Sequence, residues 1–123
     1  FLSGPGLENW YEYSTGNRKS SKEVVKLFRE GENKAVQIME KYFERTARAF
    51  STFVNILDPD VVVLGGGMSD IDELYDEIPK KIIPYLASDI FLTPIVKAKH
   101  GSSSGVRGAA HLWWVKILLF YLS

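Results

Sequence analysis

Residues 57–69 of this chain read Leu-Asp-Pro-Asp-Val-Val-Val-Leu-Gly-Gly-Gly-Met-Ser, and this stretch decides the fold. Pro59 ends a long helical pattern, since proline cannot donate a backbone hydrogen bond. Val61–Leu64 are four consecutive apolar residues, which is typical of a strand covered on both faces. Three glycines follow, and Ser69 stands where it can cap a next helix. This order of strand, glycine turn and helix start predicts an α/β protein.

The glycine turn is the strongest candidate for a ligand site. Ligands of open α/β sheets bind beyond the carboxyl ends of strands, and glycine lets a flat ring or a phosphate approach the backbone. A helix start there adds free N–H donors and a positive dipole end. One glycine would be enough for a tight connection, so three favour a nucleotide contacted by Gly65, Gly66, Gly67, Met68 and Ser69. The pattern differs from the phosphate loop, which ends in Lys-Ser/Thr, and from the dinucleotide fingerprint. The sequence therefore leaves open which part of the nucleotide lies at the turn: the base, the ribose or the phosphates.

Apolar periodicity predicts the other elements. A stripe with a step of three or four residues predicts one long helix from Glu32 to Leu57. We also expect helices over 7–13, over 22–29 behind a cap at Ser20 or Ser21, and from Ser69 onward, a second strand over 93–99 and a last helix over 105–121. Two strands make a marginal sheet. The chain is therefore expected to be part of a larger protein or to assemble with partners.

Composition excludes several classes of function. Lys and Arg together number 15, as do Asp and Glu, so no net field favours nucleic acid or an anionic membrane. The absence of cysteine excludes disulfides and thiolate metal ligands and is compatible with the cytoplasm. The apolar segment Leu112–Leu122 is shorter than the ~20 residues of a spanning helix and contains Lys116. We expect a buried helix or an oligomer contact there, not a membrane anchor.

The remaining polar residues have simpler explanations than catalysis. Asp58 and Asp60 precede the strand, at its amino end, where helix termination explains them better than a catalytic pair. Acidic residues in a helix first turn suit the dipole better than a metal, and the two histidines have no partner at metal-ligand spacing. The cations around the serine-rich turn either face a phosphate or lie solvated at a strand edge. The acidic residues are Asp70, Asp72 and Glu73, the histidines are His100 and His111, and the cations are Lys97, Lys99 and Arg107. We predict no catalytic residue and no metal ligand in this chain.

Two blocks of sequence resemble a known family. Residues 50–69, Phe-Ser-Thr-Phe-Val-Asn-Ile-Leu and then the stretch from Asp58 to Ser69, resemble ROK-family proteins, which include bacterial sugar kinases and sugar-responsive repressors. Residues 93–101, Thr-Pro-Ile-Val-Lys-Ala-Lys-His-Gly, and 103–110, Ser-Ser-Gly-Val-Arg-Gly-Ala-Ala, are similar to its fructokinase (manno(fructo)kinase) branch, although Ser102 stands where that branch usually has Asp. The resemblance runs from about Phe1 to Trp113, and residues 113–123 form an atypical apolar tail.

The resemblance implies a fold and an activity. Residues 1–123 would be the C-terminal portion of an actin-like ATPase (ribonuclease H-like) fold, helix-rich with few strands. The whole protein would use ATP and Mg²⁺ to phosphorylate a hexose, most readily fructose, with the glycine turn on the adenosine. The family's aspartate base, sugar contacts and His/Cys zinc motif would precede Phe1, so zinc has no ligands here and we expect the 123-residue chain alone to be inactive. A cytoplasmic homo-oligomer, such as a dimer, is expected.

Two alternatives remain open. The second hypothesis is that the chain is the sugar-sensing and oligomerising part of a ROK-type transcriptional repressor, although the fructokinase-like block favours a kinase. It would also suit a truncated product that survives through contacts of its apolar tail, with poor solubility as a monomer.

Overall fold

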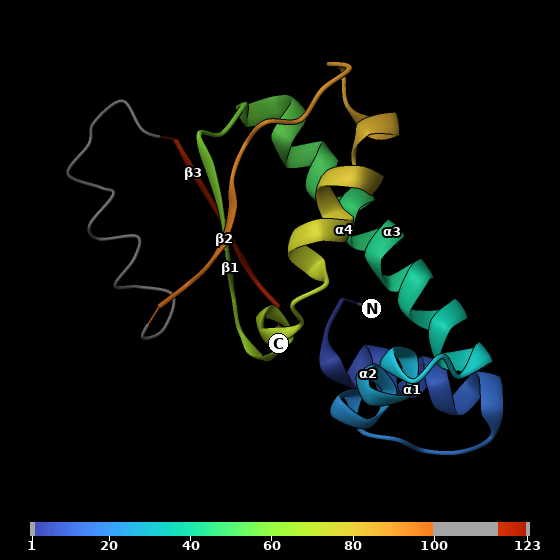
Figure 1. The fold of residues 1–123 in the computed structure, drawn as a ribbon. Helices are drawn as coiled ribbons and strands as arrows, with labels where there is room; N and C mark the ends of the chain where they lie inside the picture. Colours follow the sequence, from blue (N-terminus) through green and yellow to red (C-terminus); the bar gives the residue numbers. More distant parts are fainter. Residues whose placement is uncertain (1, 100–115, 123) are drawn as a thin grey trace.

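In the part of the chain that the structure describes, three parallel strands form one sheet. The computed structural model describes residues 2–99 and 116–122. Strand β1 (Val61–Gly65) lies in the centre, between β2 (Ile95–Lys97) and β3 (Ile117–Tyr121), and helices α3 and α4 lie on one side of the sheet (Figure 1). Val62 and Leu64 of β1 are fully buried in the core on that side. The buried apolar strand at 61–64 is confirmed.

Helix α3 (Asn33–Leu57) is the axis of the helical layer and matches the predicted apolar stripe. Glu32 caps its first turn, accepting hydrogen bonds from the backbone N–H groups of Lys34 and Ala35. Asp58 ends it in the left-handed conformation with φ 43°, which confirms the helix-terminating role predicted for that residue. The middle of the stripe is buried, namely Met39, Phe43, Ala47, Phe50 and Val54. Leu57, at the end of the stripe, is exposed instead.

Helices α1 (Gly4–Thr15) and α2 (Ser21–Arg29) pack on α3 at its amino-terminal half (Figure 1). Helix α1 is longer than predicted because Ser3 caps it, accepting a hydrogen bond from the Gly6 N–H, and Pro5 fits the first turn. Ser20 is the cap of α2 and forms a capping box with Glu23. The structure thus decides between the two serines considered for this cap.

The segment after the glycine turn differs from the prediction. It begins with a short 3-10 helix, η1 (Gly67–Asp70), before α4 (Leu74–Lys81) and η2 (Ile83–Tyr85). Ser69 is therefore not a helix cap: it lies inside η1, where its hydroxyl donates to the Gly66 carbonyl. The apolar residues that follow one face of this segment are all buried, namely Ile71, Leu74, Ile78 and Ile82.

The prediction of a last helix over 105–121 is wrong for residues 117–121, which form β3. Ile117–Tyr121 is apolar at every position, and such a run fits a buried strand and a buried helix equally well. Leu118 is buried, and the Phe120 ring stacks on Phe50 of α3 with centroids 3.9 Å apart and planes at 13°. Pairing with β1 satisfies the backbone hydrogen-bonding groups of the tail and of this edge of β1. A helix in the tail would leave this edge of β1 without backbone partners.

Several predictions lie outside the described residues. They are the turn at 101–105, the helix up to residue 115, and the placement of His100, Arg107 and His111. Within residues 2–99 and 116–122, no helix is both long enough and apolar enough to cross a membrane.

Candidate functional site

The glycine turn lies at the carboxyl end of β1, where the end of β3 meets it. The Met68 N–H donates to the Leu122 carbonyl at 3.0 Å, and the Leu122 N–H donates to the Gly65 carbonyl at 2.8 Å. Leu122, the residue after β3, is thus hydrogen-bonded to the residues on both sides of the turn. This position in a parallel sheet is the one where α/β proteins bind ligands.

Gly66 and Gly67 differ in whether the structure requires a glycine at their position. Gly66 has φ 86°, and a Cβ built on it would lie 2.3 Å from the Leu122 carbonyl oxygen. Both the backbone conformation and the contact with Leu122 therefore require glycine there. Gly67 has no left-handed φ, and a Cβ built on it would meet nothing within 4 Å. No described residue comes within 4 Å of the position where a side chain at Gly67 would begin.

A cavity of about 180 Å³ opens beside Gly67; we call it the turn cavity. One wall comes from α2 and the other from the turn and η1. The lining residues are Ser21, Lys22, Val25 and Arg29 on α2, and Gly67, Met68, Asp70 and Ile71 on the other wall. Val25, Met68 and Ile71 are buried. The turn cavity therefore combines an apolar floor with a charged rim, which suits a flat ring carrying polar groups.

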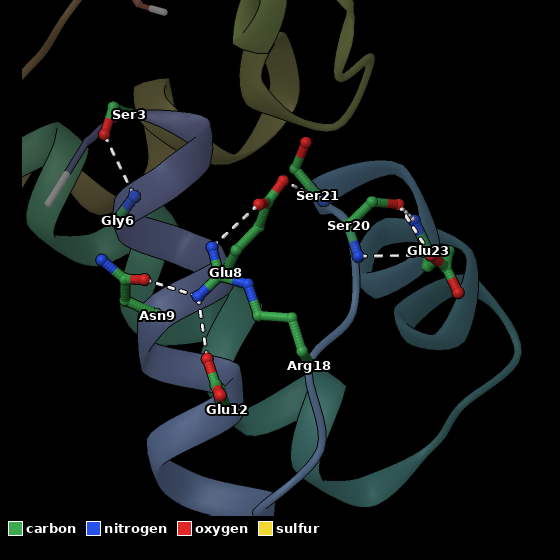
Figure 2. A network of polar contacts seen from close by, with 9 residues as sticks. All are labelled: Ser3, Gly6, Glu8, Asn9, Glu12, Arg18, Ser20, Ser21 and Glu23. Carbon is green, nitrogen blue, oxygen red and sulfur yellow. Dashed lines mark hydrogen bonds and ion pairs between the residues drawn. The ribbon is translucent and has the colours of Figure 1, made fainter.

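The α2 wall presents one helical face, since Ser21, Val25 and Arg29 recur every fourth residue. A polar network fixes where this wall begins (Figure 2). The Glu8 carboxylate accepts a hydrogen bond of 2.8 Å from the Ser21 N–H, and Arg18 donates to that carboxylate and to Glu12. The first turn of α2 is therefore anchored to α1, next to the turn cavity.

Ion pairs engage most of the charged residues around the turn. Arg29 binds Glu73 through two hydrogen bonds of 2.9 and 2.8 Å, and this bonding lowers the pKa of the Glu73 carboxyl below its usual value. Asp70 pairs with Lys97 at the end of β2. Asp70 and Glu73 thus have ionic partners within the chain, and Lys97, half exposed, lies at the end of the edge strand β2. In the part of the chain that the structure describes, no three His, Cys, Asp or Glu side chains come together as a metal site.

The acidic pair before the strand lies at the other end of the sheet. The Asp60 carboxylate accepts a hydrogen bond of 2.7 Å from the Lys116 N–H and so holds the start of β3. A larger open cavity of about 650 Å³ lies there, lined by Asp58, Asp60 and the segment from Leu86 to Pro94. Nothing in the sequence predicted it. Asn55, in its lining, is engaged by the Tyr85 carbonyl and the Ala87 N–H, so its polar group serves the fold.

Tyr75 supports the turn from α4. Its hydroxyl donates to the Ser69 carbonyl at 2.6 Å, and burial, followed by the charges of Asp70 and Asp72, raises the pKa of Tyr75 to about 12. The protonated phenol stabilises the fold fully below the ordinary tyrosine pKa of about 10, and this stability is lost as the pH rises through about 12.

Tyr75→Phe is therefore expected to weaken the decline of stability between pH 9 and pH 12, because the variant has no phenol to ionise there. Urea unfolding at several pH values measures this slope. Tyr13→Phe is the control, since Tyr13 lies on α1 and is 90% exposed. An unchanged slope in Tyr75→Phe would contradict the role given to its hydroxyl.

Comparison with known proteins assigns the chain to a family. The profile described as "ROK family" matches residues 1–116. The N-acetyl-D-glucosamine kinase of Vibrio atlanticus (strain LGP32) is 45% identical over 112 residues, covering 91% of this chain and 37% of that protein. The N-acetyl-D-glucosamine kinase of Haemophilus influenzae (strain 86-028NP) is 40% identical over 116 residues, covering 94% of this chain and 38% of that protein. This chain thus spans less than two fifths of the length of these curated relatives.

Solved structures agree on the fold. The ROK hexokinase from Thermus thermophilus superposes with a TM-score of 0.71 at 28% identity, over 89% of this chain and 37% of that one. A ROK family glucokinase from Streptomyces griseus, solved with glucose and AMPPNP, has a TM-score of 0.67 at 22% identity, over 89% of this chain and 42% of that one. The predicted fold, a helix-rich part of an actin-like ATPase lobe with few strands, is confirmed. From its profile and its relatives, this chain belongs to the ROK family.

Proposed function

We propose that the glycine turn binds the adenosine part of ATP, and that the whole protein is an ATP-dependent sugar kinase. The observation that carries this proposal is Gly67, which opens onto the turn cavity with no described residue near its missing side chain. The buried apolar floor of Val25, Met68 and Ile71 suits a purine ring. The two curated relatives named above are kinases, and the Streptomyces griseus glucokinase was solved with an ATP analogue.

This chain would supply the nucleotide side of the reaction. Phosphoryl transfer depends on positioning and on neutralising the charge of the γ-phosphate, to which Mg²⁺ bound with ATP contributes. Residues 2–99 and 116–122 offer no acidic cluster that fits a metal, so no step is assigned to a metal ligand of this chain. The base and the sugar contacts are expected outside it. The prediction that the 123-residue chain alone is inactive therefore stands as part of this proposal.

The acceptor is proposed to be a hexose or hexosamine hydroxyl. N-Acetyl-D-glucosamine is the first candidate, because both curated relatives above bear that activity in their names. Fructose, predicted from the resemblance of residues 93–110 to the fructokinase branch, is the second. The relatives do not favour the repressor alternative. A cytoplasmic homo-oligomer remains a prediction.

The test is ATP-dependent phosphorylation of N-acetyl-D-glucosamine, fructose, mannose and glucose by the product of the complete gene, with the 123-residue chain beside it. Turnover of one of these sugars by the complete product, and of none by the short chain, is the expected result. Absence of turnover with every sugar would overturn the kinase proposal. Sugar binding without turnover would favour the repressor.

Gly67→Leu tests the nucleotide site itself. The leucine side chain would fill the turn cavity, and we expect the KM for ATP to rise by roughly tenfold or more, equivalent to at least about 1.4 kcal/mol. Steady-state kinetics of the complete gene product measures this effect. Ala87→Leu, which adds bulk at the larger cavity near the opposite end of the sheet, is the control and should leave this KM unchanged. Equal KM values in Gly67→Leu and the wild type would contradict nucleotide binding at the turn.

A further inference from the structure

The ion pair between Arg29 and Glu73 joins the two walls of the turn cavity. Arg29 belongs to the last turn of α2 and lines the cavity, while Glu73 directly precedes α4 and follows the lining residue Ile71 by two positions. We propose that this pair, which we call the clasp, sets the distance between the two walls, so that Arg29 and Glu73 are positioning residues for the nucleotide. This inference rests on the proposed function.

The geometry of the clasp fixes direction as well as distance. The Arg29 Nε donates to Glu73 Oε2 at 2.9 Å, and its Nη2 donates to Oε1 at 2.8 Å. Two parallel hydrogen bonds between a planar guanidinium and a planar carboxylate hold both groups in one plane. A single point contact would leave the walls free to rotate about it.

Other contacts do not supply this constraint. Helix α2 packs on α1 and α3, and its first turn is anchored to Glu8 at the Ser21 end of the turn cavity, the opposite end of α2 from Arg29. Among the described residues, the clasp provides the only hydrogen bonds between α2 and residues 67–81. The apolar contacts of Val25, Met68 and Ile71 bring the walls together, but such contacts are not directional. The width at the Arg29 end of the turn cavity therefore depends on the clasp.

The clasp lies at the surface of the protein. The side chains of Arg29 and Glu73 are 50% and 28% exposed, so the pair is open to solvent and adds little to stability by itself. Its distinct effect is expected in ligand affinity, because a wall that moves away weakens every contact made across the turn cavity. An alternative role for Arg29 is direct contact with the phosphates, and a charge swap separates the two.

Kinetics of the complete gene product with Arg29→Glu, Glu73→Arg and the double swap tests the clasp. Each single variant places like charges opposite each other and is expected to raise the KM for ATP by about three- to tenfold. We expect the KM for ATP to rise more than kcat falls, and the KM for the sugar to stay as in the wild type. The double swap restores an opposite pair and should return the KM for ATP to within about twofold of the wild type.

Lys81→Gln is the matched control. It removes two other ion pairs, from Lys81 of α4 to Glu40 of α3 at 2.9 Å and to Glu77 of α4 at 3.1 Å, and none of these three residues lines the turn cavity. It should leave the KM for ATP unchanged. A double swap as impaired as Arg29→Glu would overturn the clasp and identify Arg29 as a direct ligand contact. Equal rises of the KM values for ATP and sugar would overturn it in favour of a general structural role. A wild-type protein that transfers no phosphate would instead remove the proposed function, and this inference with it.

Discussion

Gly66→Ala is expected to lower the free energy of unfolding by about 2 to 4 kcal/mol, because two costs add at this position. An alanine would have to adopt φ 86°, and its Cβ would lie 2.3 Å from the Leu122 carbonyl oxygen. That carbonyl accepts the Met68 N–H hydrogen bond, so the backbone must move and the bond must weaken. Urea unfolding, followed by circular dichroism, measures the loss.

Gly67→Ala is the matched control in the next position of the same turn. Its Cβ would meet nothing within 4 Å and its φ is not left-handed, so the change in unfolding free energy should stay within about 0.5 kcal/mol. If both variants lost equal stability, the turn would not have the shape described here. If Gly66→Ala were neutral, the close approach of Leu122 would be refuted.

Phe50→Ala is expected to cost about 3 to 5 kcal/mol, the usual range for removing a buried phenylalanine. Phe50 is 1% exposed, and its ring is stacked on Phe120 of β3 at 3.9 Å between centroids. The variant leaves a cavity between α3 and the sheet and removes the surface on which β3 packs. We expect a lower urea midpoint together with faster hydrogen exchange in residues 117–121.

Phe53→Ala provides the comparison, since Phe53 touches the same ring. Its centroid lies 5.3 Å from that of Phe120 in an edge-to-face arrangement, but the side chain is 45% exposed. We expect a loss of about 1 kcal/mol or less. Similar losses in both variants would show that the docking of β3 does not depend on the buried stack.

Local patterns were sufficient for helices α2 and α3, but not for the start of the helix after the glycine turn. The stripe of α3 repeats every three or four residues, and Ser20 with Glu23 three positions later is a complete capping box, so both features are visible in a short window. The buried strand at 61–64 was equally clear, because Asp60 precedes it, the glycines follow it and no charged residue interrupts it. Each of these depends on residues that are neighbours along the chain.

The tail could not be predicted in the same way. Residues 117–121 are apolar at every position, so neither a period of 2 nor one of 3.6 stands out. Their conformation is decided by the free edge of β1, a partner that lies far away in sequence. A helix was predicted because the window itself contained no evidence of that edge.

The position of the glycine turn in the sheet was predicted, but the difference between its glycines was not. The glycine turn lies at the carboxyl end of β1 as expected, but nothing in the sequence distinguishes Gly66 from Gly67. Only Leu122 distinguishes them, because it approaches Gly66 and leaves Gly67 open. The α2 wall and the clasp were missed as well, since Arg29 and Glu73 are 44 positions apart and neither forms part of a motif.

The parallel arrangement of the strands also determines an order of folding. Helices α1, α2 and α3 follow one another in sequence and pack together, so their contacts close short loops. Strand β1 has no such neighbour: the pair that holds the start of β3, Asp60 and Lys116, spans 56 positions. Because closing long loops is slow, the helices can assemble while both edges of β1 are still unpaired. A delay in pairing would therefore expose a bare apolar strand, and this step is where aggregation would compete with folding.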